Sequence, residues 1–208
     1  MKYPITEIFR SPQGEGHFFG YRMVFIRLAG CSVLNCHIRQ ECDEAPWAAK
    51  MGKLSANDIL ANVRELATRG RVCITGGEPS DHDLVPLVSS LREAGYIIHL
   101  ETSGVRRLEG IPVDWFTVSP KTDQYQQRHG QEMKIVVRPE WGNHPDGAWA
   151  YIRSFADDTQ FFHYYLQPLY GADGRPINRQ QVLDLIDCDD NNGKWAISEQ
   201  LHKAWGVK

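Results

Sequence analysis

RVCITGGEP, residues 71–79, joins a predicted strand to a glycine-rich turn, and the chain around it repeats this arrangement. Arg71 to Thr75 is mostly apolar and β-branched, which predicts a buried strand that ends at Gly76. Residues 81–94 repeat leucine and valine at helical spacing and predict a helix, and residues 96–100 predict another strand. A strand, a helix and a strand in this order form a βαβ unit with parallel strands.

The same alternation extends in both directions from this unit. Ser55 and Asp58 form a predicted capping box that opens a helix closed by Gly70. Further strands are predicted at 22–29, 115–118, 132–137, 161–166 and 195–197, and further helices at 145–155 and 178–187. We therefore expect one α/β domain over residues 1–208, with a mostly parallel sheet.

Composition excludes several classes of protein. Of the 208 residues, 42% are hydrophobic and 24% are charged, which is typical of a globular domain. The formal net charge of −3 argues against a partner that is nucleic acid or anionic lipid. The apolar runs are too short to span a bilayer, and the N-terminus lacks the apolar core of a signal peptide. We therefore expect a cytoplasmic protein whose five cysteines stay reduced.

Polar or glycine-rich residues follow five of the predicted strands. The carboxyl ends of parallel strands meet at one edge of a sheet, where α/β proteins assemble their sites. We therefore expect these segments to surround one cavity. They are Gly30-Cys31, Thr75 to Glu78, Glu101 to Gly104, Ser119-Pro120-Lys121 and Gln167-Pro168.

Cys31, Cys36 and Cys42 lie within twelve residues of one another. Thiolates are soft ligands that suit zinc or iron–sulfur clusters. With His37 as a fourth ligand the loop predicts a zinc site, and without it a four-iron cluster with one open iron. A loop that holds no metal is the third possibility. Cys73 is expected to be a buried apolar residue, and Cys188 to be exposed.

The turn Gly76-Gly77-Glu78 has the features of a binding site for a zwitterion. Two glycines allow a ligand to approach the backbone, and their free N–H groups are suited to a carboxylate. The carboxylate of Glu78 is suited to an ammonium group. The alternative is a turn that simply connects a strand to a helix.

Several segments, in this order and spacing, resemble the radical S-adenosylmethionine (SAM) superfamily and, within it, the 7-carboxy-7-deazaguanine synthase family. The resemblance extends through nearly the whole chain. The segments that carry it are Tyr3-Pro4-Ile5, Gln13-Gly14-Glu15-Gly16, residues 25–31, Thr75 to Pro79, Glu101 to Gly104, Val118 to Lys121, Gln167-Pro168 and Gln200 to Lys203.

Two segments depart from the pattern of this family. The usual loop is Cys-x3-Cys-x2-Cys, whereas this chain has four residues between Cys31 and Cys36 and five between Cys36 and Cys42. Glu44 stands where the family has a threonine implicated in holding Mg²⁺. A carboxylate is a good ligand for a hard cation, so Glu44 is the expected Mg²⁺ ligand here. The alternative is that the longer side chain changes the geometry and no ion binds.

The resemblance implies a fold, two cofactors and a set of residues that hold them. The fold is an incomplete, open (β/α) barrel of about six mainly parallel strands with fewer helices. Cys31, Cys36 and Cys42 would hold a [4Fe–4S] cluster, whose open iron binds SAM. The expected SAM-binding residues are Gly77, Glu78, Glu101, Ser103, Ser119, Pro120, Lys121, Gln167, Pro168, Leu169 and Tyr170.

The implied substrate is 6-carboxy-5,6,7,8-tetrahydropterin, which the family converts into 7-carboxy-7-deazaguanine with loss of ammonia. Arg27 is the expected partner of its carboxylate, and the alternative for Arg27 is an internal salt bridge. The C-terminal segment is expected to fold back over the site. The residues expected to contact the substrate are Pro12, Gln13, Gly14, Glu15, Arg27, Thr75, His202 and Lys208.

The family further implies a homodimer and an electron donor of flavodoxin or ferredoxin type, in a pathway to 7-deazapurines such as queuosine. Two other functions remain open. A non-catalytic or degenerate relative would bind zinc at the cysteine loop, and a glycyl-radical activase would share the cluster and the glycine-rich turn.

Overall fold

The computed structural model describes residues 1–42, 49–142, 145–188 and 193–207, and these form a nine-stranded sheet in the order β3-β1-β2-β4-β5-β6-β7-β8-β9. All neighbouring pairs from β2 to β9 are parallel, and β1 and β3 add an antiparallel edge. The strands are β1 (Lys2–Pro12), β2 (Arg22–Leu28), β3 (Gly52–Ser55), β4 (Arg71–Gly76), β5 (Ile97–Thr102), β6 (Trp115–Val118), β7 (Glu132–Val137), β8 (His163–Pro168) and β9 (Trp195–Ile197).

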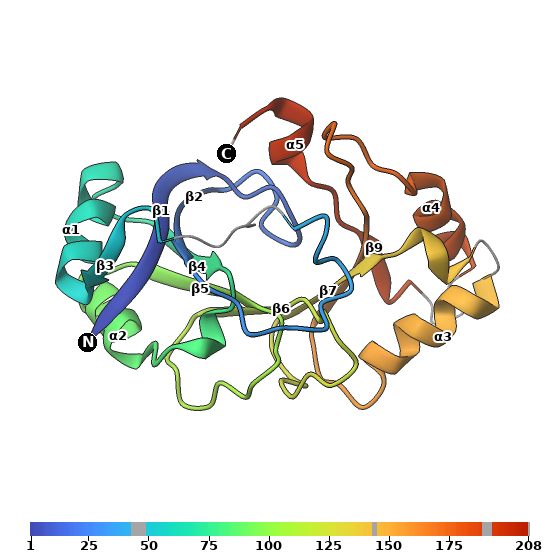
Figure 1. The fold of residues 1–208 in the computed structure, drawn as a ribbon, viewed down its shortest axis with the longest axis horizontal. Coiled ribbons are helices and arrows are strands. Elements are labelled where there is room, and N and C mark those ends of the chain that lie inside the picture. Colours follow the sequence, from blue (N-terminus) through green and yellow to red (C-terminus); the bar gives the residue numbers. More distant parts are fainter. Residues whose placement is uncertain (43–48, 143–144, 189–192, 208) are drawn as a thin grey trace.

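The sheet curves into an open arc, as Figure 1 shows, with α1 and α2 outside one half and α3 and α4 outside the other. The β5–β6 and β6–β7 connections contain no helix. The expected open barrel with fewer helices than strands is therefore confirmed. The α-helices are α1 (Ala56–Leu66), α2 (Val85–Glu93), α3 (Pro145–Ala156), α4 (Arg179–Asp187) and α5 (Leu201–Trp205).

The two faces of the sheet differ in composition. On the convex face, Ile74 and Leu100 are fully buried and share one core with Ile59 of α1 and Leu87 of α2. The concave face carries polar side chains beside a smaller apolar cluster. Arg27 lies beside Thr75 across β2 and β4. The alternation of side chains along each strand thus separates a core from a potential site.

The sequence did not indicate β1, β3 or α5. Register across β1 and β2 shifts between Ile5 and Glu7, so β1 lacks the strict alternation of a regular strand. The predicted helix at 81–94 begins at Val85, because Pro79–Asp81 forms a separate 3₁₀ turn, η1. The capping box of Ser55 and Asp58 is present at the start of α1.

The loop between β1 and β2 packs against residues at the amino ends of β5, β6 and β8. His17 stacks on Trp115 with ring centroids 4.9 Å apart and contacts the tilted ring of His163 at 4.2 Å. Phe18 packs edge-on against His99 at 4.6 Å. These aromatic contacts join the loop to three strands of the sheet. Among the helices of the described residues, none combines the length and apolar character that crossing a bilayer requires.

Candidate functional site

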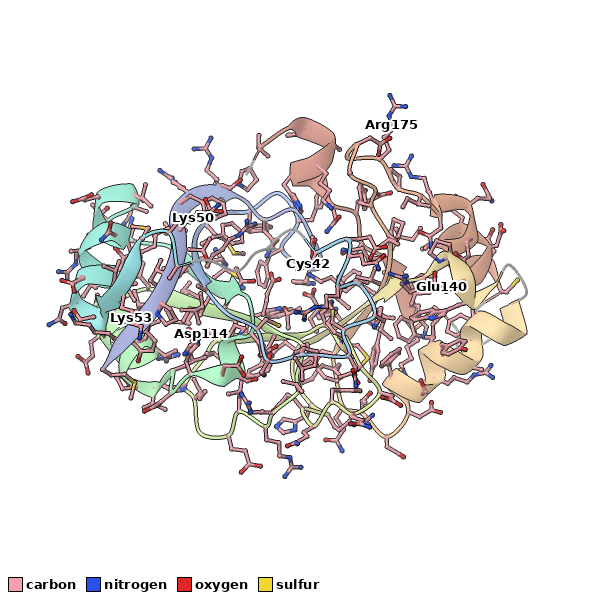
Figure 2. The ribbon with its side chains drawn as sticks, in the orientation of Figure 1. Cys42, Lys50, Lys53, Asp114, Glu140 and Arg175 are labelled. Carbon is pink, nitrogen blue, oxygen red and sulfur yellow. The ribbon has the colours of Figure 1, made fainter. Side chains whose placement is uncertain are left out.

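One cavity opens at the carboxyl ends of the strands and gathers residues from almost every predicted motif. Pro120 is not among the residues of its wall, and Glu44 and Lys208 lie outside the described residues. In Figure 2, Cys42 lies inside the arc of the sheet, whereas Arg175 points away from the molecule. The predicted residues that line the cavity are Pro12, Gln13, Gly14, Glu15, Arg27, Cys31, Cys36, Cys42, Thr75, Gly77, Glu78, Glu101, Ser103, Ser119, Lys121, Gln167, Pro168, Leu169, Tyr170 and His202.

The three thiols of the cysteine loop face this one cavity, and each is partly buried and free of disulfides. Burial raises the pKa of Cys31, and the backbone N–H of Val33 partly opposes that shift. Burial likewise raises the pKa of Cys36, which also interacts electrostatically with Cys42 and Lys121. Cys73 is fully buried and Cys188 is exposed, as expected.

The residue types of this loop suit an iron–sulfur cluster, because thiolates are the ligands that such clusters use. The three cysteines line one cavity and none is in a disulfide. Among the described residues, no three His, Cys, Asp or Glu side chains stand close enough together to hold one metal ion.

Among the described residues, His37 does not join the cysteines in a group that could hold a metal ion. Its Nδ1 lies 2.9 Å from the carbonyl oxygen of Lys121, and its ring packs against Trp141 and Phe155. Burial lowers the pKa of His37 to about 4, and the Lys121 ammonium adds to that effect. His37 is therefore neutral and donates from Nδ1 to the carbonyl.

The glycine-rich turn does not present free N–H groups, which corrects the sequence-based expectation. The N–H of Gly77 donates to the carbonyl of Leu28, and the N–H of Glu78 donates to that of Gly30, both at 2.9 Å. A Cβ on Gly77 would lie 1.7 Å from the Gly30 oxygen. The glycines thus let the end of β4 approach β2 at the residue that precedes Cys31.

Gly77→Ala is therefore expected to destabilise the folded protein by about 1–3 kcal/mol, because backbone atoms must shift to admit the new methyl group. Chemical denaturation of the cluster-free protein measures this cost. The same shift would move Cys31, so iron uptake should also fall. A variant with wild-type stability and iron uptake would contradict the close approach of these two segments.

Glu78 is buried, and its carboxylate binds the residues at the carboxyl end of β5. Its carboxylate accepts hydrogen bonds from the N–H of Ser80 at 2.9 Å, from the N–H of Ser103 at 2.9 Å, and from the hydroxyls of Thr102 and Ser103. Four donors occupy the acceptor sites of a carboxylate. A ligand ammonium at Glu78 would therefore have to displace one of these hydroxyls.

Sequence reasoning did not identify Lys134 as a site residue, although Lys134 lies at the floor of the cavity. Its side chain is 4% exposed and forms ion pairs with Glu15 and, at 3.5 Å, with Glu101. Burial raises the pKa of Glu15, but Lys134 more than offsets this and the pKa falls to about 2. The signal was present in the sequence, because Lys134 is a single lysine within the otherwise apolar segment MKIVV.

Glu132 lies two residues before Lys134 in β7 and has a different environment. Its carboxylate accepts from the N–H of His17 at 3.2 Å and from Nε1 of Trp115 at 3.3 Å. Burial raises the pKa of Glu132 to about 7, although Lys134 opposes the shift. This acid therefore holds a proton over part of the neutral pH range.

Arg27 and Lys121 supply positive charge at the cavity wall. Arg27 pairs with Glu7 at 3.1 Å and lies over the ring of Phe9, so the internal salt bridge considered as its alternative is present. Lys121 donates to the hydroxyl of Ser119. Burial lowers the pKa of Lys121, and the charge of Lys134 adds to this.

The C-terminal segment folds back onto residues 13–16, as expected. The N–H of Leu201 donates to the carbonyl of Gly14 at 3.0 Å, and Nε2 of Gln200 donates to Glu15 at 2.7 Å. A Cβ on Gly14 would lie 2.6 Å from Nδ1 of His202. Gln200, a second residue that sequence reasoning missed, therefore joins the end of the chain to the cavity floor.

The following three known proteins match nearly the full length of the chain, and all three carry the same name. The chain is 36% identical to the 7-carboxy-7-deazaguanine synthase of Escherichia coli K12, over 98% of each chain. It is 33% identical to the protein of that name from Synechocystis, over 100% of this chain and 95% of the other. With the Bacteroides thetaiotaomicron protein of that name it shares 31% identity over the whole of both chains.

A solved structure also matches. The crystal structure of QueE from Escherichia coli superposes with a TM-score of 0.71 and 32% identity, and the match covers 97% of this chain and 95% of the other. A scan of protein-family profiles finds none that matches.

Proposed function

Because the chain belongs to the 7-carboxy-7-deazaguanine synthase family, we propose that it converts 6-carboxy-5,6,7,8-tetrahydropterin into 7-carboxy-7-deazaguanine with loss of ammonia. The chain is accordingly a radical SAM enzyme and a lyase of 7-deazapurine biosynthesis. The observation that carries the proposal is one cavity in which three thiols, the glycine-rich turn and a charged floor meet. The family assignment favours this function over a zinc-binding module or a glycyl-radical activase.

The cysteines and the strand ends would hold the cofactors. Cys31, Cys36 and Cys42 would be the ligands of a [4Fe–4S] cluster, which with SAM supplies a 5′-deoxyadenosyl radical when bound. Glu78 and the strand end that it organises, Ser103 included, would contact the amino-acid part of SAM. Lys121 is suited to a carboxylate because it lies buried in the wall beside Cys36. The full set of proposed SAM contacts is Gly77, Glu78, Glu101, Ser103, Ser119, Pro120, Lys121, Gln167, Pro168, Leu169 and Tyr170.

The cavity floor would bind the pterin. Glu15 remains ionised at neutral pH and is suited to the N–H groups of the aminopyrimidinone edge. Gln13 is held by a 2.7 Å hydrogen bond to Glu101, so its amide is fixed in place. Arg27 and His202 would approach the substrate carboxylate from the wall and from α5. The remaining proposed contacts are Pro12, Gly14, Thr75 and Lys208.

The test is a single-turnover assay on the complete chain. Protein reconstituted with iron and sulfide, then reduced chemically, is mixed with SAM and 6-carboxytetrahydropterin without oxygen. We expect 7-carboxy-7-deazaguanine to form in amounts that exceed those of methionine, because SAM is regenerated. Zinc without sulfide in the purified protein, together with no product, would instead support a binding module.

We further propose several properties that follow from the family. The protein would act as a homodimer in the cytoplasm, as a single domain over residues 1–208. A flavodoxin or ferredoxin would supply its electron. Mg²⁺ would bind near Glu44, and omission of Mg²⁺ from the assay, with Glu44→Ala as the matched variant, measures that contribution.

A further inference from the structure

The cysteine loop is held by the scaffold at three separate places. Four residues separate Cys31 from Cys36, and five separate Cys36 from Cys42. Spacers of this length leave many backbone conformations open, so chain connectivity alone does not place the three sulfurs. The loop has turns of its own, and contacts with residues outside it add further restraints on the three sulfurs.

The first place is at Cys31. The next residue, Ser32, donates from its N–H to one carboxylate oxygen of Asp81 at 2.9 Å and from its hydroxyl to the other at 2.6 Å. Asp81 ends the 3₁₀ turn η1 (Pro79–Asp81) and is itself bound by Arg106. The Asp81 carboxylate therefore binds two atoms of Ser32, and Arg106, in the loop that follows β5, fixes the carboxylate itself.

The second place is at Cys36. Both the backbone N–H of His37 and its ring Nδ1 reach the carbonyl oxygen of Lys121, at 3.0 and 2.9 Å. Lys121 follows β6, and the aromatic rings of Trp141 and Phe155 surround the imidazole. Two donors on one carbonyl fix both the backbone and the side chain of His37.

The third place is at Cys42. The preceding residue, Glu41, pairs with Arg138 at 3.0 Å. Arg138 follows β7 and is 16% exposed, so water screens this pair less than a surface pair. Arg138 also pairs with Glu140, which holds the guanidinium from the other side.

We infer that Asp81, Arg138 and the Lys121 carbonyl with His37 are positioning groups that each place one cluster cysteine through the residue next to it. Neighbouring Cα atoms are about 3.8 Å apart, so holding Ser32, His37 and Glu41 leaves each thiol little freedom. The extra residues then fall between the held points, as Leu34 does with 77% exposure. This inference rests on the proposed cluster-dependent function.

The experiment measures iron retention, not turnover. Asp81→Ala, His37→Phe and Arg138→Met are reconstituted beside the wild-type chain, and iron and sulfide content, the EPR spectrum of the reduced cluster and the rate of iron loss to a chelator are recorded. We expect iron loss to be about tenfold faster in each variant, as for other residues that orient metal ligands. We also expect an altered EPR signal, and a larger effect in double variants.

Conservative variants separate positioning from general damage. His37→Asn can still donate near the Nδ1 position and Asp81→Asn can still accept, so both should recover part of the wild-type retention. Arg107→Met is the matched control, because Arg107 pairs with Glu109 at 3.1 Å and both side chains are well exposed. Thermal unfolding of the cluster-free forms shows whether each variant folds.

Two outcomes would overturn the inference in distinguishable ways. A wild-type chain that assembles a cluster, beside folded variants with unchanged retention and EPR signals, would overturn the inference and leave the proposed function intact. A wild-type chain that takes up no iron and sulfide would overturn the proposed function and the inference with it.

Discussion

Cys36→Ala is expected to abolish product formation and to lower the iron content from about four atoms per chain to a small fraction of that, since a four-iron cluster with one open iron needs all three thiolates. Cys36 is central among the three cysteines, because its thiol interacts electrostatically with those of both Cys31 and Cys42. Iron and sulfide analysis, the cluster absorbance band that bleaches on reduction, and the pterin assay measure the loss.

Cys188→Ala is the matched control for this variant. Cys188 is exposed at the end of α4 and does not line the cavity, so iron content and product formation should stay at the wild-type level. If Cys36→Ala kept a complete cluster that cleaves SAM, the assignment of the cysteine loop would be wrong.

Lys134→Met is expected to cost about 3–5 kcal/mol of folding free energy, because it leaves buried carboxylates without their cation. In a chain of this length that corresponds to a fall in Tm of roughly 10 °C. Lys134 pairs with Glu15 and Glu101, so both side chains would also leave their positions in the cavity. Urea denaturation of the cluster-free protein measures the first effect, and KM for the pterin measures the second.

The stability deficit of Lys134→Met should also depend on pH. In the wild-type protein the pKa of Glu15 is about 2, below its unfolded value, so its stabilising contribution is present above pH 4.5 and is lost as pH falls toward 2. Without Lys134, burial is opposed only by the charge of His202 and the hydrogen bond from Gln200, so the pKa of Glu15 rises. Protonation of Glu15 then removes its unpaired charge. The loss of folding free energy in Lys134→Met, relative to the wild-type protein, should therefore be smaller at pH 5 than at pH 7.

Lys53→Met is a suitable control, because Lys53 is exposed on the edge strand β3 and should show little change at either pH. A deficit for Lys134→Met that is the same at pH 5 and pH 7 would show that the lost charge pairing is not its cause. In the wild-type protein the pKa of Glu132 is about 7, so this acid also makes the protein less stable as pH rises toward 7. Because Lys134 opposes that shift, the pKa of Glu132 rises further in the variant and adds to the same pH dependence.

Local sequence patterns were sufficient to predict the parallel α/β architecture and the edge of the sheet that carries the site. Both follow from local signals, since side chains alternate along a strand and glycines end it. Thus RVCITGGEP placed a strand and a turn correctly, and the cysteines, Glu78, Glu101 and Lys121 all line the cavity predicted from strand ends. The strand β1 was missed because its register shift interrupts that local pattern.

Tertiary structure alone decided which partners these residues have. Lys134 meets Glu15 across 119 residues of sequence, and Arg138 meets Glu41 across 97. The N–H of Gly77, which the sequence alone predicted to be free, donates to the carbonyl of Leu28 in β2, and the next N–H, that of Glu78, donates to Gly30. Such pairings depend on the curvature of the sheet and on the order of its strands. The periodicity within one segment carries no information about either.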